Sequence, residues 1–329
     1  MNLKSIIQLT EKEMQAVNKI ISNQLNSNIQ IINQLGNYII TSGGKKIRPI
    51  IAILVGKVLG YQGGKHINIA ALVEFIHTAT LLHDDVVDES NIRRGKKTAN
   101  SIFGNATSIL VGDFMYTRSF QMMTDLNSMT ILKLMSDATN IIAEGEVLQL
   151  INCNNPDITE STYMQIIYNK TARLFEVAAH ASAIVSGANK KQQKALQYYG
   201  KYLGTAFQLM DDFRDYDSDS NNTGKNIGND LNEGKLTLPL LHAMKEGSPK
   251  ESSLIRNAIV KGNGRALLKT ILITMKRCGS LEYTKEIAKK EAEKAIQIID
   301  ILPHSSYKDA LISLPYISIQ PTAEKILFK

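Results

Sequence analysis

Apolar residues recur along most of the chain at the three- and four-residue spacing that one face of an α-helix requires. In residues 69–87 the apolar positions advance by such steps, namely at Leu72, Phe75, Ala79, Leu82 and Val86. The same spacing continues in three further segments, residues 131–150, 163–186 and 194–212. Alternating segments flanked by hairpin turns are hard to find, so we expect long helices rather than strands.

Short runs rich in glycine, asparagine, serine and proline separate these helical segments. They fall at residues 42–44, 63–64, 152–157, 218–228 and 246–249. None is typical of a flexible linker between domains, and no repeat of fixed period is convincing. The pattern therefore favours an all-α fold, which we expect to form a single domain over residues 1–329.

Two of the predicted helices end in a cluster of aspartates with the same spacing. The segment LLHDDVVDES carries Asp84, Asp85 and Asp88, and LMDDFRDYD carries Asp211, Asp212 and Asp215. The first and last aspartate of each cluster lie one turn apart on one helix face. Like charges at this spacing destabilise an isolated helix by about 0.2–0.5 kcal/mol, so we expect a positive partner.

The chemistry of these clusters favours a hard cation. Carboxylates without clustered cysteine or histidine suit Mg²⁺, which prefers one or two carboxylates plus substrate phosphates to a cage made only of protein. Two such clusters predict Mg²⁺ ions held around a diphosphate. A solvated helix end is the alternative for either cluster, but two clusters that each close an apolar helix favour the metal interpretation.

The net charge of +7 fits either nucleic acid or an anionic small molecule. No nucleic-acid motif and no long basic run is present, so we expect no nucleic-acid partner. The cations instead lie beside glycines or the aspartate clusters, at Lys45, Lys46, Arg48, Arg93, Arg94, Lys225 and Lys235. Arginine binds phosphate in a bidentate manner and lysine acts as a point charge, so the set suits diphosphates, although Lys46 alone is expected on the surface.

Cysteine use and hydropathy bear on the compartment. Cys153 and Cys278 form no metal-ligand cluster and are typical of a reduced, cytoplasmic protein. The apolar run at residues 49–56 is far shorter than the roughly 20 residues that a membrane span needs. We therefore expect a cytoplasmic protein without a membrane span.

These motifs, in this order, resemble the trans-prenyltransferases, the isoprenyl diphosphate synthases. The resemblance covers nearly the whole chain, through GGKKIRP, LLHDDVVDES with RRG, GD at residues 112–113, KT at 170–171, FQLMDD and GKNIGNDLNEGK. Flanks such as EFIHTATLLHDDVVDES and AEGEVLQL are most similar to the octaprenyl diphosphate synthases of bacteria. The resemblance implies an isoprenoid synthase-type bundle of antiparallel helices around a deep central cavity, working as a homodimer.

It also implies the reaction. An Mg²⁺-assisted ionisation of an allylic diphosphate such as farnesyl diphosphate would be followed by attack of isopentenyl diphosphate. Repeated cycles would build a long, lipophilic polyprenyl chain for a quinone side chain.

The resemblance assigns roles to individual residues. Asp84, Asp88 and Asp211 match metal ligands, and Asp212 and Asp215 would act directly or through water. Contacts to isopentenyl diphosphate match Lys45, Arg48, His77 and Arg94. Contacts to the allylic diphosphate or the developing charge match Arg93, Lys170, Thr171, Gln208, Lys225 and Lys235. Asp84, Asp88, Asp211, Lys170 and Lys235 would carry the catalysis, whereas His83 is expected to be structural.

Small side chains one turn before the first cluster predict a long product. Ala79 and Thr80 would leave the passage for the growing tail open. Met123, about 15 Å along its helix from Asp113 by helix rise, would limit the chain together with Met135.

Two alternatives stay open beside a synthase of different product length. A noncatalytic subunit of a heteromeric synthase would lose aspartates or phosphate-binding cations, which this chain keeps. A class I terpene cyclase would not need the second diphosphate site that GGKKIRP and RRG resemble. Arg214 departs from the family pattern inside the second cluster, where it could pair with an aspartate or face solvent.

Overall fold

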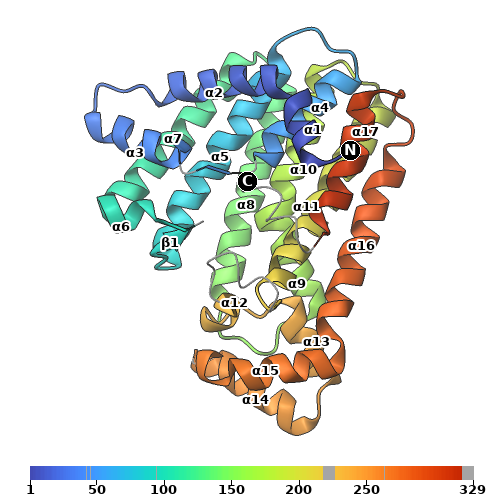
Figure 1. Cartoon of the computed structure of the whole chain (residues 1–329). Helices are drawn as coiled ribbons and strands as arrows, with labels where there is room; N and C mark the ends of the chain where they lie inside the picture. Colours follow the sequence, from blue (N-terminus) through green and yellow to red (C-terminus); the bar gives the residue numbers. More distant parts are fainter. Residues whose placement is uncertain (42, 45, 94, 218–226, 263, 321–329) are drawn as a thin grey trace. The chain divides into compact units, whose positions relative to one another are not determined.

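The computed structural model describes residues 1–41, 43–44, 46–93, 95–217, 227–262 and 264–320. Helices account for nearly all of its regular structure (Figure 1), which confirms the all-α prediction. The chain divides by its contacts into two compact units. The first unit contains Met1–Asp137, Leu174–Gln197 and Ile301–Leu311, and the second contains Ala138–Arg173, Tyr198–Asp300 and Ile312–Lys329. That residues 1–329 form one domain stays a prediction.

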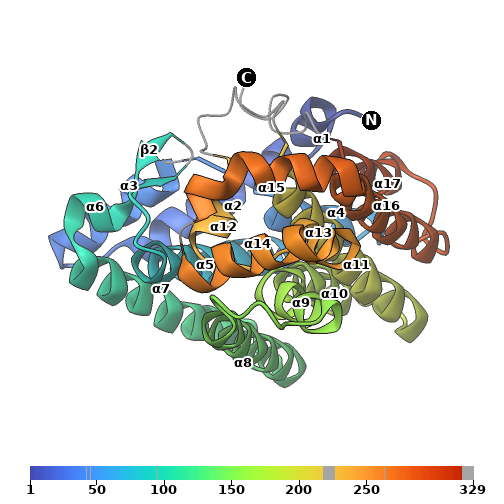
Figure 2. The same ribbon diagram turned by 90° about the horizontal axis from the view of Figure 1, so that it is seen from below.

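The first unit is built around α5. Its helices are α1 (Leu3–Leu9), α2 (Glu11–Leu25), α3 (Gln30–Thr41), α4 (Ile47–Val58), α5 (Lys65–Val87), α6 (Ala99–Phe103) and α7 (Asn105–Asp125). Helix α5 packs against α2, α4 and α7 (Figure 2). Helix α4 is apolar almost all round and is buried over most of its length, as expected for a helix enclosed by others. Together α4 and α5 supply the core on which the first aspartate cluster is mounted.

A small hairpin follows α5 directly and was not predicted. Strands β1 (Ile92–Arg93) and β2 (Lys96–Lys97) pair antiparallel, with Arg93 opposite Lys96. Gly95 takes a positive φ of 73° between them, a backbone conformation that favours glycine. The pairing is too short to give an alternating hydrophobic pattern, which is why the sequence did not indicate it.

The second unit contains the remaining helices and parts of four helices whose residues fall in both units. Its own helices are α9 (Glu160–Ile167), α12 (Asn229–Asn232), α13 (Leu238–Glu246), α14 (Pro249–Lys261), α15 (Gly264–Cys278) and α16 (Ser280–Ile298), with the π-helix η1 (Tyr168–Ala172). The helices α8 (Met129–Ile151), α10 (Arg173–Val185), α11 (Lys190–Arg214) and α17 (Ser306–Ser318) have residues in each unit. Helices α14 and α15 lie side by side against α13 (Figure 1).

Three of the four predicted helical segments are confirmed. Residues 69–87, 131–150 and 194–212 lie within α5, α8 and α11. The fourth segment, residues 163–186, is helical as predicted but is not a single α-helix, because the backbone passes from α9 into the π-helix η1 and then into α10. A π-helix of this kind inside an α-helical run is rare and often marks a functional site.

A close approach between backbones accompanies the π-helix. A Cβ atom added to Gly145 of α8 would lie 2.7 Å from Asn169 Cβ and 2.9 Å from Lys170 N. Only glycine at position 145 therefore lets α8 come this near to η1, which brings Lys170 and Thr171 next to α8.

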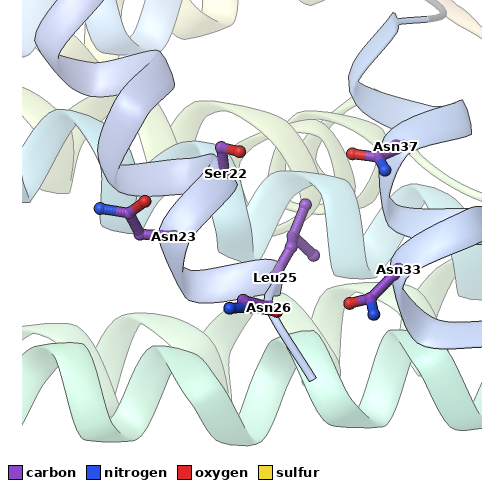
Figure 3. Close-up of a pocket in the computed structure, with 6 residues that line it drawn as sticks. All are labelled: Ser22, Asn23, Leu25, Asn26, Asn33 and Asn37. Carbon is purple, nitrogen blue, oxygen red and sulfur yellow. The ribbon is translucent and has the colours of Figure 1, made fainter. Parts of the chain in front are cut away.

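A polar pocket of about 240 Å³ lies between α2 and α3 in the first unit (Figure 3). Its lining consists of Ser22, Asn23, Leu25, Asn26, Asn33 and Asn37. The side-chain amide of Asn33 is already hydrogen-bonded, because it accepts from Ser27 N and donates to Ser27 O. The predicted site residues do not line this pocket.

Candidate active site

The first aspartate cluster closes α5. Asp84 and Asp88 are half-buried, and the backbone N–H of Asp88 donates to Asp84 O at 2.8 Å, so the last turn of the helix is intact. Burial of Leu72, Phe75 and Ile76 on the same helix fixes the direction of the cluster. The two carboxylates predicted to bind metal therefore sit one turn apart on a rigid support.

Asp85, between them, is turned inward. Only 1% of its surface is exposed, and its Oδ1 accepts a hydrogen bond from Arg93 Nε at 2.7 Å. Burial raises the pKa of the Asp85 carboxyl, and the guanidinium of Arg93 opposes that rise. The backbone carbonyl of Asp85 also accepts from Asn100 Nδ2 at 3.2 Å, so the hairpin and α6 both anchor this end of α5.

Besides Arg93, two predicted diphosphate contacts in the first unit are described, and both were expected to bind isopentenyl diphosphate. The guanidinium of Arg48, on α4, lies 4.4 Å from the ring centroid of Phe175, and His77 is half-buried on α5. Lys46, expected on the surface, donates from Nζ to Asn18 Oδ1 at 2.6 Å. Three further predicted contacts, Lys45, Arg94 and Lys225, lie outside the described residues.

The residues predicted to set product length all belong to the first unit. Ala79 and Met135 have no exposed surface, Met123 is 1% exposed, and Thr80 is half-buried. Ala79 belongs to the buried face of α5 and Met123 to the buried face of α7, two helices that pack on each other. Their roles in limiting the product stay predictions.

His83 makes contacts within the first unit, and its structural role stays a prediction. Its Nε2 lies 3.1 Å from Ile109 O and 3.3 Å from Asp113 Oδ1, both on α7. A Cβ atom at Gly112 would lie 2.4 Å from the same nitrogen, so the glycine makes room for the histidine ring. His83 therefore ties α5 to α7 immediately before the cluster.

The second aspartate cluster, in the second unit, is organised around Asp212. This residue is 4% exposed, and both of its carboxylate oxygens accept hydrogen bonds. Tyr163 Oη donates to Oδ2 at 2.6 Å and Gln208 Nε2 donates to Oδ1 at 2.7 Å. Burial raises the pKa of Asp212 to about 7, and the charges of Asp211 and Asp215 add to the rise against the two hydrogen bonds.

Asp215 holds the short helix α12. Its Oδ1 accepts from Asn229 N at 3.1 Å and its Oδ2 from Asp230 N at 3.0 Å, which satisfies backbone donors at the helix start. Burial, together with Asp215 and Asp212, raises the pKa of Asp230 well above its usual range. Asp230 is thus a further acidic residue in this region, and within the cluster Asp211 and Asp215 are half-buried whereas Asp212 is buried.

Lys170 and Thr171 lie on the π-helix η1, which belongs to the second unit as well. Lys170 Nζ donates to Glu146 Oε2 at 2.5 Å and to Gln149 Oε1 at 2.7 Å, both on α8. Thr171 Oγ1 donates to Gln208 Oε1 at 2.8 Å. Thr171, Gln208 and Asp212 are therefore joined in one chain of hydrogen bonds.

Arg214 does not face solvent, so that alternative is wrong. It is 8% exposed, and its Nη2 donates to Ser318 O at 2.8 Å and to Gln320 O at 3.2 Å. The guanidinium thus ties the end of α11 to the end of α17. Lys235 is a predicted diphosphate contact, and its Nζ lies 2.7 Å from Glu233 Oε2.

Four residues of these regions were missed in the sequence. Tyr163, Glu146, Gln149 and Asp230 are separated from their partners by intervals that no local pattern shows. For Glu146 and Gln149 a signal existed, because they lie in AEGEVLQL, one of the segments that carried the resemblance. Tyr163 gave no signal, since a tyrosine in an apolar helix is usually a packing residue.

Each aspartate cluster, taken by itself, has the ligand type that suits a hard divalent cation. Asp84 and Asp88 in the first unit, and Asp211 in the second, carry carboxylate oxygens, which Mg²⁺ prefers. In the part of the chain that the structure describes, no three His, Cys, Asp or Glu side chains come together as a preformed metal cage. None of the described helices is long and apolar enough to cross a membrane.

Comparisons with known proteins cover almost the whole chain. The family model "Polyprenyl synthetase" matches residues 29–275. The chain is 59% identical over 320 residues to the octaprenyl diphosphate synthase of Escherichia coli (strain K12), covering 97% of this chain and 99% of that one. It is 56% identical over 319 residues to the octaprenyl diphosphate synthase of Haemophilus influenzae, covering 97% of each chain.

A solved structure gives the same result at the level of the fold. The polyprenyl synthase of Caulobacter crescentus CB15, complexed with calcium and isoprenyl diphosphate, matches with a TM-score of 0.92 at 38% identity over 97% of both chains. Residues 29–275, which the family model matches, contain both aspartate clusters and the lysine-threonine pair of η1. The chain therefore belongs to the polyprenyl synthetase family and is a trans-prenyltransferase.

Proposed function

We propose that the chain is an octaprenyl diphosphate synthase, which adds isopentenyl diphosphate repeatedly to an allylic diphosphate such as farnesyl diphosphate. The observation that carries this proposal is the identity of 59% to an octaprenyl diphosphate synthase over 97% of the chain. The product would serve as a quinone side chain. The enzyme would act in the cytoplasm as a homodimer.

The proposed metal ligands are Asp84, Asp88 and Asp211, with Asp212 and Asp215 acting directly or through water. Bound Mg²⁺ would neutralise the diphosphate that leaves the allylic substrate. The protein's own part is to keep the carboxylates in place. In the first cluster, the ion pair between Asp85 and Arg93 holds the end of α5, where Asp84 and Asp88 lie one turn apart.

The lysine and threonine of η1 would bind the allylic diphosphate. Glu146 and Gln149 hold the Lys170 ammonium group near α8, which orients a positive charge in advance of substrate binding. Charge placed beforehand costs no reorganisation when the allylic C–O bond breaks. Gln208 and Lys235 would act on the same substrate, together with Arg93 and Lys225.

Isopentenyl diphosphate would bind separately, through Lys45, Arg48, His77 and Arg94. Its double bond would attack the allylic carbon, and the proton lost afterwards would go to the released diphosphate. Support for two diphosphate sites comes from the two groups of cations in the sequence, which a terpene cyclase would not need. Both aspartate clusters and these cations are kept, which disfavours a noncatalytic subunit.

Purified protein alone provides the test. Incubation with farnesyl diphosphate, isopentenyl diphosphate and Mg²⁺, followed by chromatography of the dephosphorylated products, should give octaprenol as the main species. If the main product has another length, the enzyme is a polyprenyl diphosphate synthase of that length and not an octaprenyl diphosphate synthase. No elongation by the chain alone, with activity restored by a second protein, would support the subunit alternative.

A further inference from the structure

Tyr163 is a buried polar group that the proposed mechanism does not use. It lies on α9, only 3% exposed, and its hydroxyl donates to Asp212 Oδ2 at 2.6 Å. Its ring packs in an apolar cluster with Leu209, Met210 and Leu238. If packing were its whole role, phenylalanine would fill the same space without a buried hydroxyl that needs a partner. The hydroxyl therefore has a use of its own.

That use begins with the orientation of Asp212. Its carboxylate accepts from Tyr163 at Oδ2 and from Gln208 Nε2 at Oδ1. Hydrogen bonds to both oxygens, from donors on two different helices, prevent the carboxylate from rotating about its Cβ–Cγ bond. Because Tyr163 comes from α9 and Gln208 from α11 itself, removing the tyrosine leaves Gln208, on the same helix as Asp212, as the remaining donor to its carboxylate among the described residues.

The orientation then passes to Gln208 and Thr171. Gln208 turns its NH₂ group toward Asp212, so its carbonyl oxygen is left to accept from Thr171 Oγ1 at 2.8 Å. Thr171 must then point its hydroxyl hydrogen at Gln208. With Asp212 accepting at both oxygens, the position of its carboxylate determines which end of Gln208 faces it and therefore which end faces Thr171.

We propose that Tyr163 is a positioning residue that acts through Asp212 to fix the side chains of Gln208 and Thr171 for the allylic diphosphate. The inference rests on the proposed function, because the contacts of Gln208 and Thr171 to that substrate come from the family resemblance. It assigns Tyr163 no contact with the reacting atoms. Because Gln208 and Thr171 are expected to contact the allylic diphosphate, removing the Tyr163 hydroxyl should affect that substrate and not isopentenyl diphosphate.

The variant Tyr163→Phe removes the hydroxyl and keeps the ring. We expect kcat/KM for farnesyl diphosphate to fall about tenfold, in line with the loss of one buried hydrogen bond that orders a site. KM for isopentenyl diphosphate should stay within about twofold of the wild-type value. The control is Tyr199→Phe, which removes a hydroxyl from another buried tyrosine, in the first half of α11 and before Gln208, and should leave both constants unchanged.

A double-mutant cycle tests the route through Asp212. In an Asp212→Asn background, Tyr163→Phe should change kcat/KM by less than about twofold, because the partner of the hydroxyl is already altered. Equal effects in the two backgrounds would overturn the inference. So would wild-type kinetics for Tyr163→Phe, or equal losses for both substrates accompanied by a lower melting temperature.

Binding of methylenebisphosphonate in the presence of Mg²⁺, measured by calorimetry, gives a readout without turnover. Tyr163→Phe should weaken this binding about fivefold or more, and Tyr199→Phe should not. Equal affinities for wild type and Tyr163→Phe would overturn the inference. If the wild-type protein makes no prenyl product, the proposed function fails, but the calorimetric comparison still decides the role of Tyr163.

Discussion

Arg93 Nε lies 2.7 Å from Asp85 Oδ1, so the middle aspartate of the first cluster is paired with an arginine from the hairpin that follows it. Asp85 is 1% exposed, whereas 35% of the Arg93 side chain remains exposed. One cation therefore supports the structure of the cluster and still reaches solvent, where a diphosphate could meet it. The resemblance predicted the second role and the structure adds the first.

This pairing predicts a loss of stability when the arginine is removed. Arg93→Met leaves the Asp85 carboxylate buried without its partner, which should lower the free energy of unfolding by about 1–3 kcal/mol in urea titrations without metal or substrate. The double variant Asp85→Asn with Arg93→Met should recover part of the loss, because the unpaired charge is gone. Unchanged stability of Arg93→Met would show that the ion pair contributes nothing to the fold.

Product length offers a prediction that separates a passage from a packed core. Ala79→Phe should shorten the products while the melting temperature stays near that of the wild type, because the ring enters space meant for the growing chain. If Ala79 instead packs against protein, the added ring should destabilise the fold by about 1–3 kcal/mol. Chromatography of the products and thermal melts on the same samples distinguish the two results.

The matching change at the far end of the passage is Met123→Ala, which should lengthen the products. Its control is Met122→Ala, the neighbouring buried methionine on α7, which should leave the length distribution unchanged. The same shift in both variants would mean that loosening of α7, rather than a specific floor, sets the length.

His66 predicts how stability depends on pH. It is 4% exposed at the start of α5; burial lowers its pKa below the usual 6.5, Lys57 adds to this, and the Gly63 backbone and Glu13 oppose it. Below about pH 6.5 the unfolded chain takes up a proton that the folded protein resists. The contribution of His66 is therefore complete above that pH and is lost as the pH falls.

Urea titrations between pH 7 and 5 measure this effect. The wild-type free energy of unfolding should fall over that range more steeply than that of His66→Leu. His304→Leu, at an exposed position, is the control and should follow the wild type. Parallel curves for the wild type and His66→Leu would contradict the assignment.

The sequence predicted the parts of the site that depend on local spacing. The helical period located α5 and α11, and the spacing of the aspartates placed Asp84 and Asp88 on one face. It could not predict Asp212 with Tyr163 or Arg214 with Ser318, because partners that far apart in the chain meet only through tertiary packing. The π-helix was missed because it shifts the apolar pattern by only one residue, and the shift is hidden where consecutive residues are all buried, as over 171–179.

The central claim is that the two aspartate clusters hold divalent cations on which turnover depends. The most direct measurement is the rate of prenyl elongation against Mg²⁺ concentration for the wild type, Asp84→Asn and Asp211→Asn, with EDTA as the metal-free reference. We predict no measurable product in EDTA and a loss of about 100-fold or more in kcat for either variant. Elongation that persists without divalent ions, or variants that turn over like the wild type, would contradict the account.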